Sequence, residues 1–291
     1  MRKEYGYVTE LREWLTLRNY AASTISGYCS SLRQFLVWHE GQEFGPEIDT
    51  GHVRRYLLHR HDQGRSWMTI NCDYSVLQQF FTNILKRDWD VDNLPRPRGE
   101  KSLPPLISCE EVEKLINAAR SLKHQAFIAL LYGTGLRLSE ALALRITHVD
   151  GQRKQLRVIK GKGGKDRYVN LPECLLPILR SYYLEYRPVD YLFNGQTAGS
   201  KWSARAAQYA IEEARSEAGI TREVHPHVLR HCYATHHLEG GTNLVYLKEQ
   251  LGHKNLKTTA RYIRLCVEYP RQVHHPLARL QLARPQEQGK V

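Results

Sequence analysis

The chain has 291 residues, of which 42% are hydrophobic, and its basic residues outnumber the acidic ones to give a formal net charge of +12. This composition excludes a disordered chain, and the longest apolar run, 126–132, is too short to cross a bilayer. The length predicts about two domains. The first residues contain no apolar signal core and the six cysteines form no C-x-x-C pair, so we expect a cytoplasmic protein without a structural zinc site.

The positive charge is unevenly distributed along the chain. Residues 1–106 contain 14 basic and 13 acidic side chains, whereas residues 107–291 contain 28 and 17. A basic domain attracts polyanions because each phosphate contact releases counterions. Charge alone leaves DNA, RNA and anionic membrane surfaces as alternative partners.

Residues 1–92 are predicted to form a small bundle of about four helices. The two clearest apolar stripes at helical spacing are Ile25, Tyr28, Leu32 and Phe35, and Ile70, Tyr74, Leu77, Phe81 and Ile84. Ser23 and Thr24 precede the first stripe and are expected to cap its helix. Weaker patterns cover 5–18 and 50–61. Such aromatic-rich stripes are typical of a buried core rather than of a binding surface.

A linker is predicted at 93–106, because four prolines in this stretch deny helix and favour extended chain. The second domain is expected to span 107–291 and to open with a helix. Its first residues contain a Ser-x-x-Glu capping box, Ser108–Glu111. A further helix is predicted at about 123–132.

A β-hairpin is predicted in the middle of the second domain. Leu156–Ile159 and Arg167–Leu171 are rich in β-formers and flank a glycine-rich segment, 161–166. Helices are expected again from about 173 onward. The predicted fold class is therefore mainly α with a small antiparallel β-sheet.

Arg137 is the first candidate for chemistry. It follows the glycine-broken turn at 133–135 and stands where a helix is expected to begin. A helix N-terminus favours anions, and a guanidinium there can grip two phosphate oxygens. The ordinary alternative is an ion pair with Glu140, three residues on.

The hairpin tip is the second candidate, because its basic residues could approach DNA. These residues are Lys160, Lys162, Lys165 and Arg167. The tip does not match a phosphate-binding P-loop, since Asp166 follows Lys165 where that motif needs Ser or Thr. An ordinary solvated basic hairpin is the alternative.

The third candidate is a histidine cluster at the start of a predicted helix. His227 and His231 have the spacing of a zinc-protease motif, but Val228 occupies the position of the essential glutamate. His227 and Arg230 share a helical face and could reach one phosphate. Histidine can move a proton near neutral pH, while arginine stays charged.

The fourth candidate is the segment that contains His253 and Tyr262. A lone tyrosine is usually core or surface filler. Here, however, two arginines, two histidines and a lysine form a set suited to one phosphodiester. Arginines neutralise its oxygens, a lysine or histidine protonates the leaving oxygen, and a phenol can attack phosphorus and hold the phosphate covalently.

Together these segments resemble the tyrosine recombinase (phage integrase) family, including its Xer-like members. The matching segments, in the family's order, are Thr134–Glu140, Gly161–Arg167, His227–His231, Leu251–His253 and Tyr262. The resemblance implies catalytic roles for Arg137, Lys162, His227, Arg230, His253 and the nucleophile Tyr262, with Glu140 in support. It implies DNA contacts for Lys160, Lys165 and Arg167.

The resemblance also implies how such a protein works. A helical core-binding domain and the catalytic domain would form a C-shaped clamp on double-stranded DNA at specific sites. Strands would be cut through a 3′-phosphotyrosyl link and exchanged through a Holliday junction, without ATP, metal or other cofactor. A homotetramer would act, with accessory DNA-bending proteins in some systems, at the nucleoid. A helix at 276–284 would dock on a neighbouring protomer.

Two features depart from the family pattern. His225 stands where relatives often have a small residue, and the chain after Tyr262 matches no relative. Two other functions stay open: DNA relaxation by a type IB topoisomerase, and binding of DNA without catalysis. Integration, excision and resolution are not distinguished, because base recognition depends on contacts that a sequence does not reveal.

Overall fold

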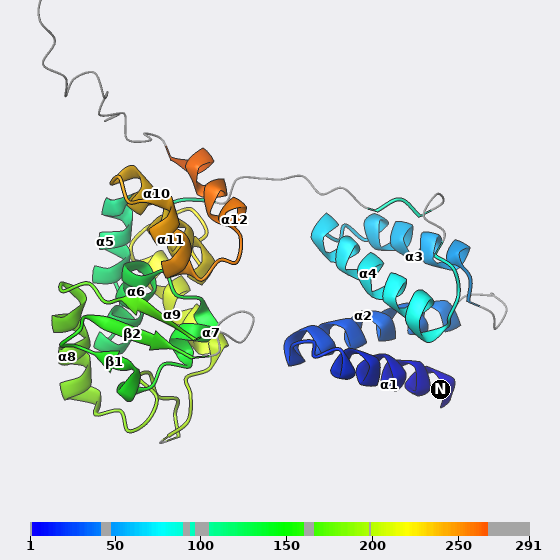
Figure 1. Ribbon diagram of the computed structural model, residues 1–291, viewed down its shortest axis with the longest axis horizontal. Helices are drawn as coiled ribbons and strands as arrows, with labels where there is room; N and C mark the ends of the chain where they lie inside the picture. Colours follow the sequence, from blue (N-terminus) through cyan, green and yellow to red (C-terminus); the bar gives the residue numbers. More distant parts are fainter. Residues whose placement is uncertain are drawn as a thin grey trace, which may run out of the picture. The chain divides into compact units, whose positions relative to one another are not determined.

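The computed structural model describes residues 2–41, 48–89, 94–96, 105–159, 166–197 and 199–266. The chain divides into two compact units, Met1–Ser102 and Leu103–Val291, which are described separately (Figure 1). Within the described ranges, no helix is both long and apolar enough to span a membrane.

The N-terminal unit is a helical bundle, as predicted. Its elements are α1 (Arg2–Leu17), α2 (Ala22–Glu40), α3 (Thr50–Asp62), α4 (Trp67–Gln79) and a π-helical turn η1 (Phe80–Ile84). Helix α1 packs against α2, and α4 packs against both α2 and α3 (Figure 1). Both predicted stripes enter one core, where Leu32, Phe35, Leu77 and Phe81 are almost fully buried.

The predicted cap of α2 was wrong. The helix begins at Ala22, and its N-cap is Ala21, which makes no side-chain cap bond. Ser23 and Thr24 therefore already lie within the first turn. A true capping box begins α3 instead, where the Asp49 side chain accepts from the backbone N–H of His52 at 2.8 Å.

The C-terminal unit combines helices with one small sheet. Its helices are α5 (Cys109–Asn117), α6 (Leu122–Thr134), α7 (Leu138–Leu142), α8 (Leu175–Tyr186), α9 (Ala204–Glu217), α10 (Pro226–Glu239), α11 (Leu244–Leu251) and α12 (Leu256–Ala260), with 3₁₀ turns η2 (Ile146–His148) and η3 (Arg261–Leu265). The strands are β1 (Val149–Asp150), β2 (Gln155–Val158) and β3 (Arg167–Asn170).

The predicted hairpin is confirmed as the antiparallel pair β2–β3, in which Leu156 faces Val169. The sheet has one further strand, β1, in the order β1-β2-β3. The two residues of β1 are too few to show a period of their own. The hairpin tip at 160–165 lies outside the described residues.

Helix α6 lies at the centre of the unit, because every residue from 126 to 131 is buried. It packs against α8 and α10, which explains the longest apolar run of the sequence. The predicted capping box before α5 is confirmed: Ser108 Oγ accepts from the N–H of Glu111 at 3.2 Å, and Glu111 Oε2 from that of Ser108 at 2.8 Å.

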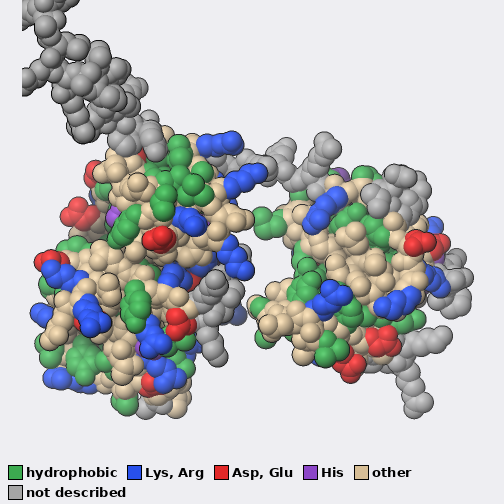
Figure 2. Space-filling model, in the orientation of Figure 1, with side chains coloured by type: hydrophobic (Ala, Val, Ile, Leu, Met, Phe, Trp, Pro, Cys, Tyr) green, Lys and Arg blue, Asp and Glu red, His purple; other side chains and the backbone are tan. Residues whose placement is uncertain are grey.

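A second, smaller core joins α10, α11 and η3, and these elements gather with α12 at one end of the unit (Figure 1). Its buried members are Tyr233, Ala234, Leu238, Leu247, Leu251 and Tyr262. The segment that contains Tyr262 is therefore fixed by packing against α10 and α11. Lys and Arg side chains are spread over the visible face of the unit (Figure 2).

Candidate active site

Arg230 is buried in α10, with only 3% of its surface exposed. Its guanidinium donates from Nη1 to the carbonyl of Gly135 at 2.5 Å, and from Nη2 to the carbonyl of Leu251 at 2.6 Å and to His253 Nε2 at 3.0 Å. Both carbonyls lie at C-terminal ends of helices, α6 and α11, where the helix dipole is negative. Burial lowers the pKa of Arg230 to about 10, so the group stays charged at neutral pH.

Gly135 makes this arrangement possible. Its φ of +61° is left-handed, and a Cβ at this position would lie 2.4 Å from Cδ1 of Tyr233. A side chain would therefore both strain the backbone and displace the ring. The glycine turn seen in the sequence is what directs a carbonyl at Arg230.

Glu140 joins two other arginines. Its carboxylate accepts from Arg137 Nη1 at 2.9 Å and from Arg167 Nη1 and Nη2 at 2.9 and 2.8 Å, and it also accepts from the backbone N–H of Arg137 at 3.0 Å. Burial alone would raise the pKa of Glu140, but Arg167 and Arg137 outweigh it and lower the pKa to about 2. The ion pair that was the ordinary alternative for Arg137 is thus present.

Arg167 lies in a different environment from the one expected. We expected a DNA contact, but its side chain is only 14% exposed and holds Glu140 through two hydrogen bonds. Its Nε also donates to the carbonyl of Gln250 at 3.2 Å. These bonds hold the guanidinium of Arg167 against Glu140 and Gln250, and a DNA contact of Arg167 stays a prediction.

His253 connects Arg230 to Thr259. Since a guanidinium can only donate, His253 Nε2 accepts, and the neutral ring carries its proton on Nδ1, 2.9 Å from Thr259 Oγ1. Burial and then the charge of Arg230 lower the pKa of His253 to about 4. The ring is therefore neutral at pH 7.

Tyr262 is 3% exposed and lies beside the rings of His231 and His253. Its hydroxyl is 3.2 Å from His231 Nδ1, and its ring is nearly parallel to that of His253, with centroids 6.2 Å apart. Burial raises the pKa of Tyr262, while Arg230 and Arg261 oppose the rise. The phenol is thus protonated in the free protein.

The remaining predicted residues are less closely connected. His227 lies on the first turn of α10, where the partial burial of its ring and then the neighbouring His225 lower its pKa. Its ring centroid is 6.3 Å from that of His225. Lys160, Lys162 and Lys165 lie outside the described residues. The structure therefore brings together Arg230, His253 and Tyr262 directly, and connects Arg137 to Arg167 through Glu140.

Sequence reasoning missed His231, Thr259 and the two carbonyls that hold Arg230. His231 was considered only as a zinc ligand, and within the described residues no three His, Cys, Asp or Glu side chains are grouped to hold a metal. A signal for His231 was present, since it follows Arg230 directly in a helix. Nothing in the sequence pointed to Thr259.

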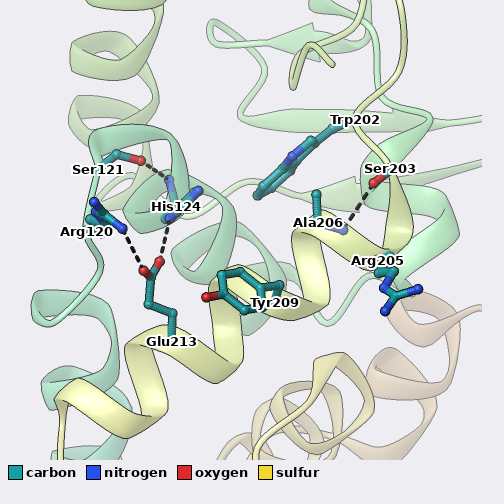
Figure 3. Close-up of a pocket in the computed structure, with 9 residues that line it drawn as sticks. All are labelled: Arg120, Ser121, His124, Trp202, Ser203, Arg205, Ala206, Tyr209 and Glu213. Carbon is teal, nitrogen blue, oxygen red and sulfur yellow. Dashed lines mark hydrogen bonds and ion pairs between the residues drawn. The ribbon is translucent and has the colours of Figure 1, made fainter. Parts of the chain in front are cut away.

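A separate hollow of about 700 Å³ lies between the start of α6 and α9 (Figure 3). Among the residues that line it, Arg120 Nη1 pairs with Glu213 Oε1 at 3.0 Å, and the His124 ring stacks on the Trp202 ring with centroids 5.6 Å apart. Lys123 lies over the Trp202 ring at 4.3 Å. None of the candidate catalytic residues lines this hollow.

Two family models match the chain: the phage integrase family over residues 106–268, and the phage integrase N-terminal SAM-like domain over 8–91. A putative integrase/recombinase of Sinorhizobium fredii is 35% identical over 260 residues, covering 88% of this chain and 83% of that protein. Tyrosine recombinase XerA of Thermococcus kodakarensis is 33% identical over 270 residues, covering 91% and 92%.

Solved structures of recombinases are also similar to this chain. The crystal structure of XerA recombinase has 28% identity and a TM-score of 0.52, covering 89% of this chain and 93% of that one. A lambda integrase dimer bound to a core site has 17% identity and a TM-score of 0.73, covering 89% and 94%. The second likeness shows a shared fold.

Proposed function

The chain belongs to the phage integrase family of tyrosine site-specific recombinases, and on that premise we propose that Tyr262 is the residue that becomes joined to DNA. The observation that carries the proposal is the position of its hydroxyl. It lies 3.2 Å from His231, in the same small core that adjoins buried Arg230. Family membership gives no support to DNA relaxation or to binding without catalysis.

The arginines would hold the scissile phosphate. Arg137 and Arg167 share the single carboxylate of Glu140, and Arg230 bonds to backbone carbonyls and His253 with no carboxylate, so positive charge is left over. Excess positive charge stabilises the additional negative charge of a pentacoordinate phosphate, and fixed donors do so without reorganisation. Arg230 and Arg137 would contact the phosphate oxygens, assisted by His253.

The proton transfers would be divided among other groups. Lys162 would protonate the 5′-oxygen as it leaves, and His227 would assist proton transfer. The product is a 3′-phosphotyrosyl link, which conserves the energy of the broken bond. The 5′-hydroxyl of a partner strand can then attack this link, so neither ATP nor metal is consumed.

Assembly follows from the same proposal. The helical unit, with domain limits at about 1–92, and the catalytic unit, from about 107, would clamp double-stranded DNA at specific recombination sites. Relatives of the same fold are described as bound to such DNA, including XerH on its difH substrate and the Tn1549 transposon integrase on circular intermediate DNA. A homotetramer would exchange strands through a Holliday junction, with accessory DNA-bending proteins where the site requires them.

The test is the replacement of Tyr262 by Phe, which removes only the nucleophilic oxygen. On a suicide DNA substrate bearing a nick, the wild type should accumulate covalent protein–DNA complex and Tyr262→Phe should form none, with unchanged DNA affinity. Tyr182→Phe is the matched control, because Tyr182 is equally buried but lies against Phe193, away from the candidate site. Covalent complex formed by Tyr262→Phe would show that another residue attacks.

A further inference from the structure

The hydroxyl of Tyr262 is hydrogen-bonded to a histidine that the proposed mechanism does not yet use. His231 Nδ1 lies 3.2 Å from the phenol oxygen, with ring centroids 5.5 Å apart. We infer that His231 takes the proton of Tyr262 as the phenol attacks phosphorus, an inference that rests on the proposed function of Tyr262.

The other histidines are less suited to this step. Both ring nitrogens of His253 are engaged, Nε2 by Arg230 and Nδ1 by Thr259. His227 makes no hydrogen bond to Tyr262 in the described part of the chain. His231 is thus the imidazole in contact with the reacting oxygen. It also follows Arg230 in α10, so one helix presents the phosphate-binding cation and the base at adjacent positions.

The charge state of His231 fits a base. Burial, and then Arg261, His227, Arg230 and His225, lower the pKa of His231 to about 4, so the ring is neutral and can accept a proton. A phosphodiester bound beside Arg230 would add a negative charge that offsets these cations. The affinity of His231 for a proton would therefore rise when DNA is bound. In the absence of DNA the phenol would stay protonated.

The step balances in both directions. As the bond forms between the phenol oxygen and phosphorus, the phenol proton moves to His231 Nδ1. The bond between phosphorus and the 5′-oxygen breaks, and the leaving oxygen takes its proton from the separate acid. During rejoining the incoming 5′-hydroxyl loses its proton to that acid's conjugate base, and the departing phenol oxygen recovers its proton from His231.

The direct test is His231→Asn, because the asparagine side chain can reach the position of Nδ1 and accept a hydrogen bond but cannot take the proton. Formation of covalent complex on a suicide substrate should slow by roughly 10²-fold or more, as for loss of a general base. DNA affinity should not change. His237→Asn is the matched control on the same helix, since His237 bonds to Thr242 instead, at 3.0 Å.

Two readouts separate a base from a merely structural residue. In the wild type the cleavage rate should fall as pH drops and His231 in the complex becomes protonated. The groups that face His231 are His225, His227 and Arg230 on α10, and Arg261 and Tyr262 on η3. In His231→Asn the plateau above the pKa of His231 should vanish, and the rate should rise with pH across the whole range because hydroxide must then remove the phenol proton.

The second readout uses DNA with a 5′-bridging sulfur at the scissile phosphate, whose departure needs no proton. The defect of His231→Asn should persist with this DNA, because the proton lost is that of the nucleophile. Rescue by the sulfur would place His231 on the leaving-group side and overturn the inference. So would a wild-type rate and pH profile in His231→Asn and in a second variant, His231→Gln. Neither result would affect the test of Tyr262 itself, which rests on Tyr262→Phe.

Discussion

The arginines of the candidate site are held in two different ways. On one side, Arg137 and Arg167 share the carboxylate of Glu140, a conventional ion-pair network at the junction of α7 and β3. On the other side, Arg230 is buried against two backbone carbonyls and a neutral histidine. In the first arrangement the carboxylate fixes the two arginines but offsets part of their positive charge. In the second, neutral groups fix Arg230, and its full positive charge stays available to a phosphate.

This difference assigns separate tasks to the two sides. A carboxylate beside a phosphate-binding arginine weakens its attraction for the phosphate, while helix carbonyls orient it through partial charges. Arg230 should therefore supply most of the stabilisation of the transition state. Glu140 and Arg167 should chiefly supply rigidity and fold stability.

The largest effect is expected from Arg230. Arg230→Ala should slow formation of the covalent complex by roughly 10²- to 10³-fold, about 3–4 kcal/mol, as for loss of a fixed oxyanion donor. Arg230→Lys should restore little, since an ammonium cannot bridge two carbonyls and a phosphate with a planar fork. The rate on a suicide substrate measures this, with exposed Arg222→Ala as control. A near-normal rate for Arg230→Lys would contradict the assignment of transition-state stabilisation to the buried guanidinium of Arg230.

A smaller effect, on stability, is expected from Glu140. Its pKa is lowered from 4.5 to about 2 in the folded chain, so its ion pairs stabilise the fold above about pH 4.5 and are lost as pH falls towards 2. Glu140→Gln should lower the free energy of unfolding by about 2–3 kcal/mol at neutral pH. Urea unfolding at several pH values checks this: the gap between wild type and variant should close in acid, and a gap independent of pH would contradict it.

The smallest effects should come from two glycines, one on each side. Gly135→Ala forces a Cβ to within 2.4 Å of the Tyr233 ring, and Gly252→Ala brings one to 3.0 Å from the Arg167 guanidinium. Both have positive φ, which costs about 1–2 kcal/mol for alanine. Gly135→Ala should add a steric cost, and it should slow cleavage because the Gly135 carbonyl that holds Arg230 is displaced. Gly252→Ala should affect mainly thermal stability. Equal losses of cleavage in both would contradict the division of tasks.

Much of the fold was predictable from the sequence because its signals are local. The stripes of α2 and α4, the capping box at Ser108 and the β2–β3 hairpin each depend on residues within a few positions of one another. The errors occurred where local signals compete or are too short. Ser23 and Thr24 are good caps, yet α2 begins just before them, and β1 has only two residues.

The candidate site was predictable in its residue types but not in its connections. The motifs indicated Arg137, Arg230, His253 and Tyr262, and the structure places the last three in one cluster. What the sequence could not reveal were contacts made across tertiary distance, such as Arg230 with a carbonyl 95 residues earlier. The contact of Tyr262 with His231 spans 31 residues and likewise depends on how η3 packs on α10.

The two carbonyls that hold Arg230 also order events during synthesis. One is supplied by Gly135, long before the arginine, and the other by Leu251, 21 residues after it. A chain emerging from the ribosome therefore cannot seat this arginine until α11 has been made, and Tyr262 emerges later still. A copy that ends before Leu251 lacks one of the two carbonyls that hold Arg230, and any copy that ends before Tyr262 lacks the proposed nucleophile. If Tyr262 is the nucleophile as proposed, we expect cleavage of DNA only once the C-terminal unit is almost complete.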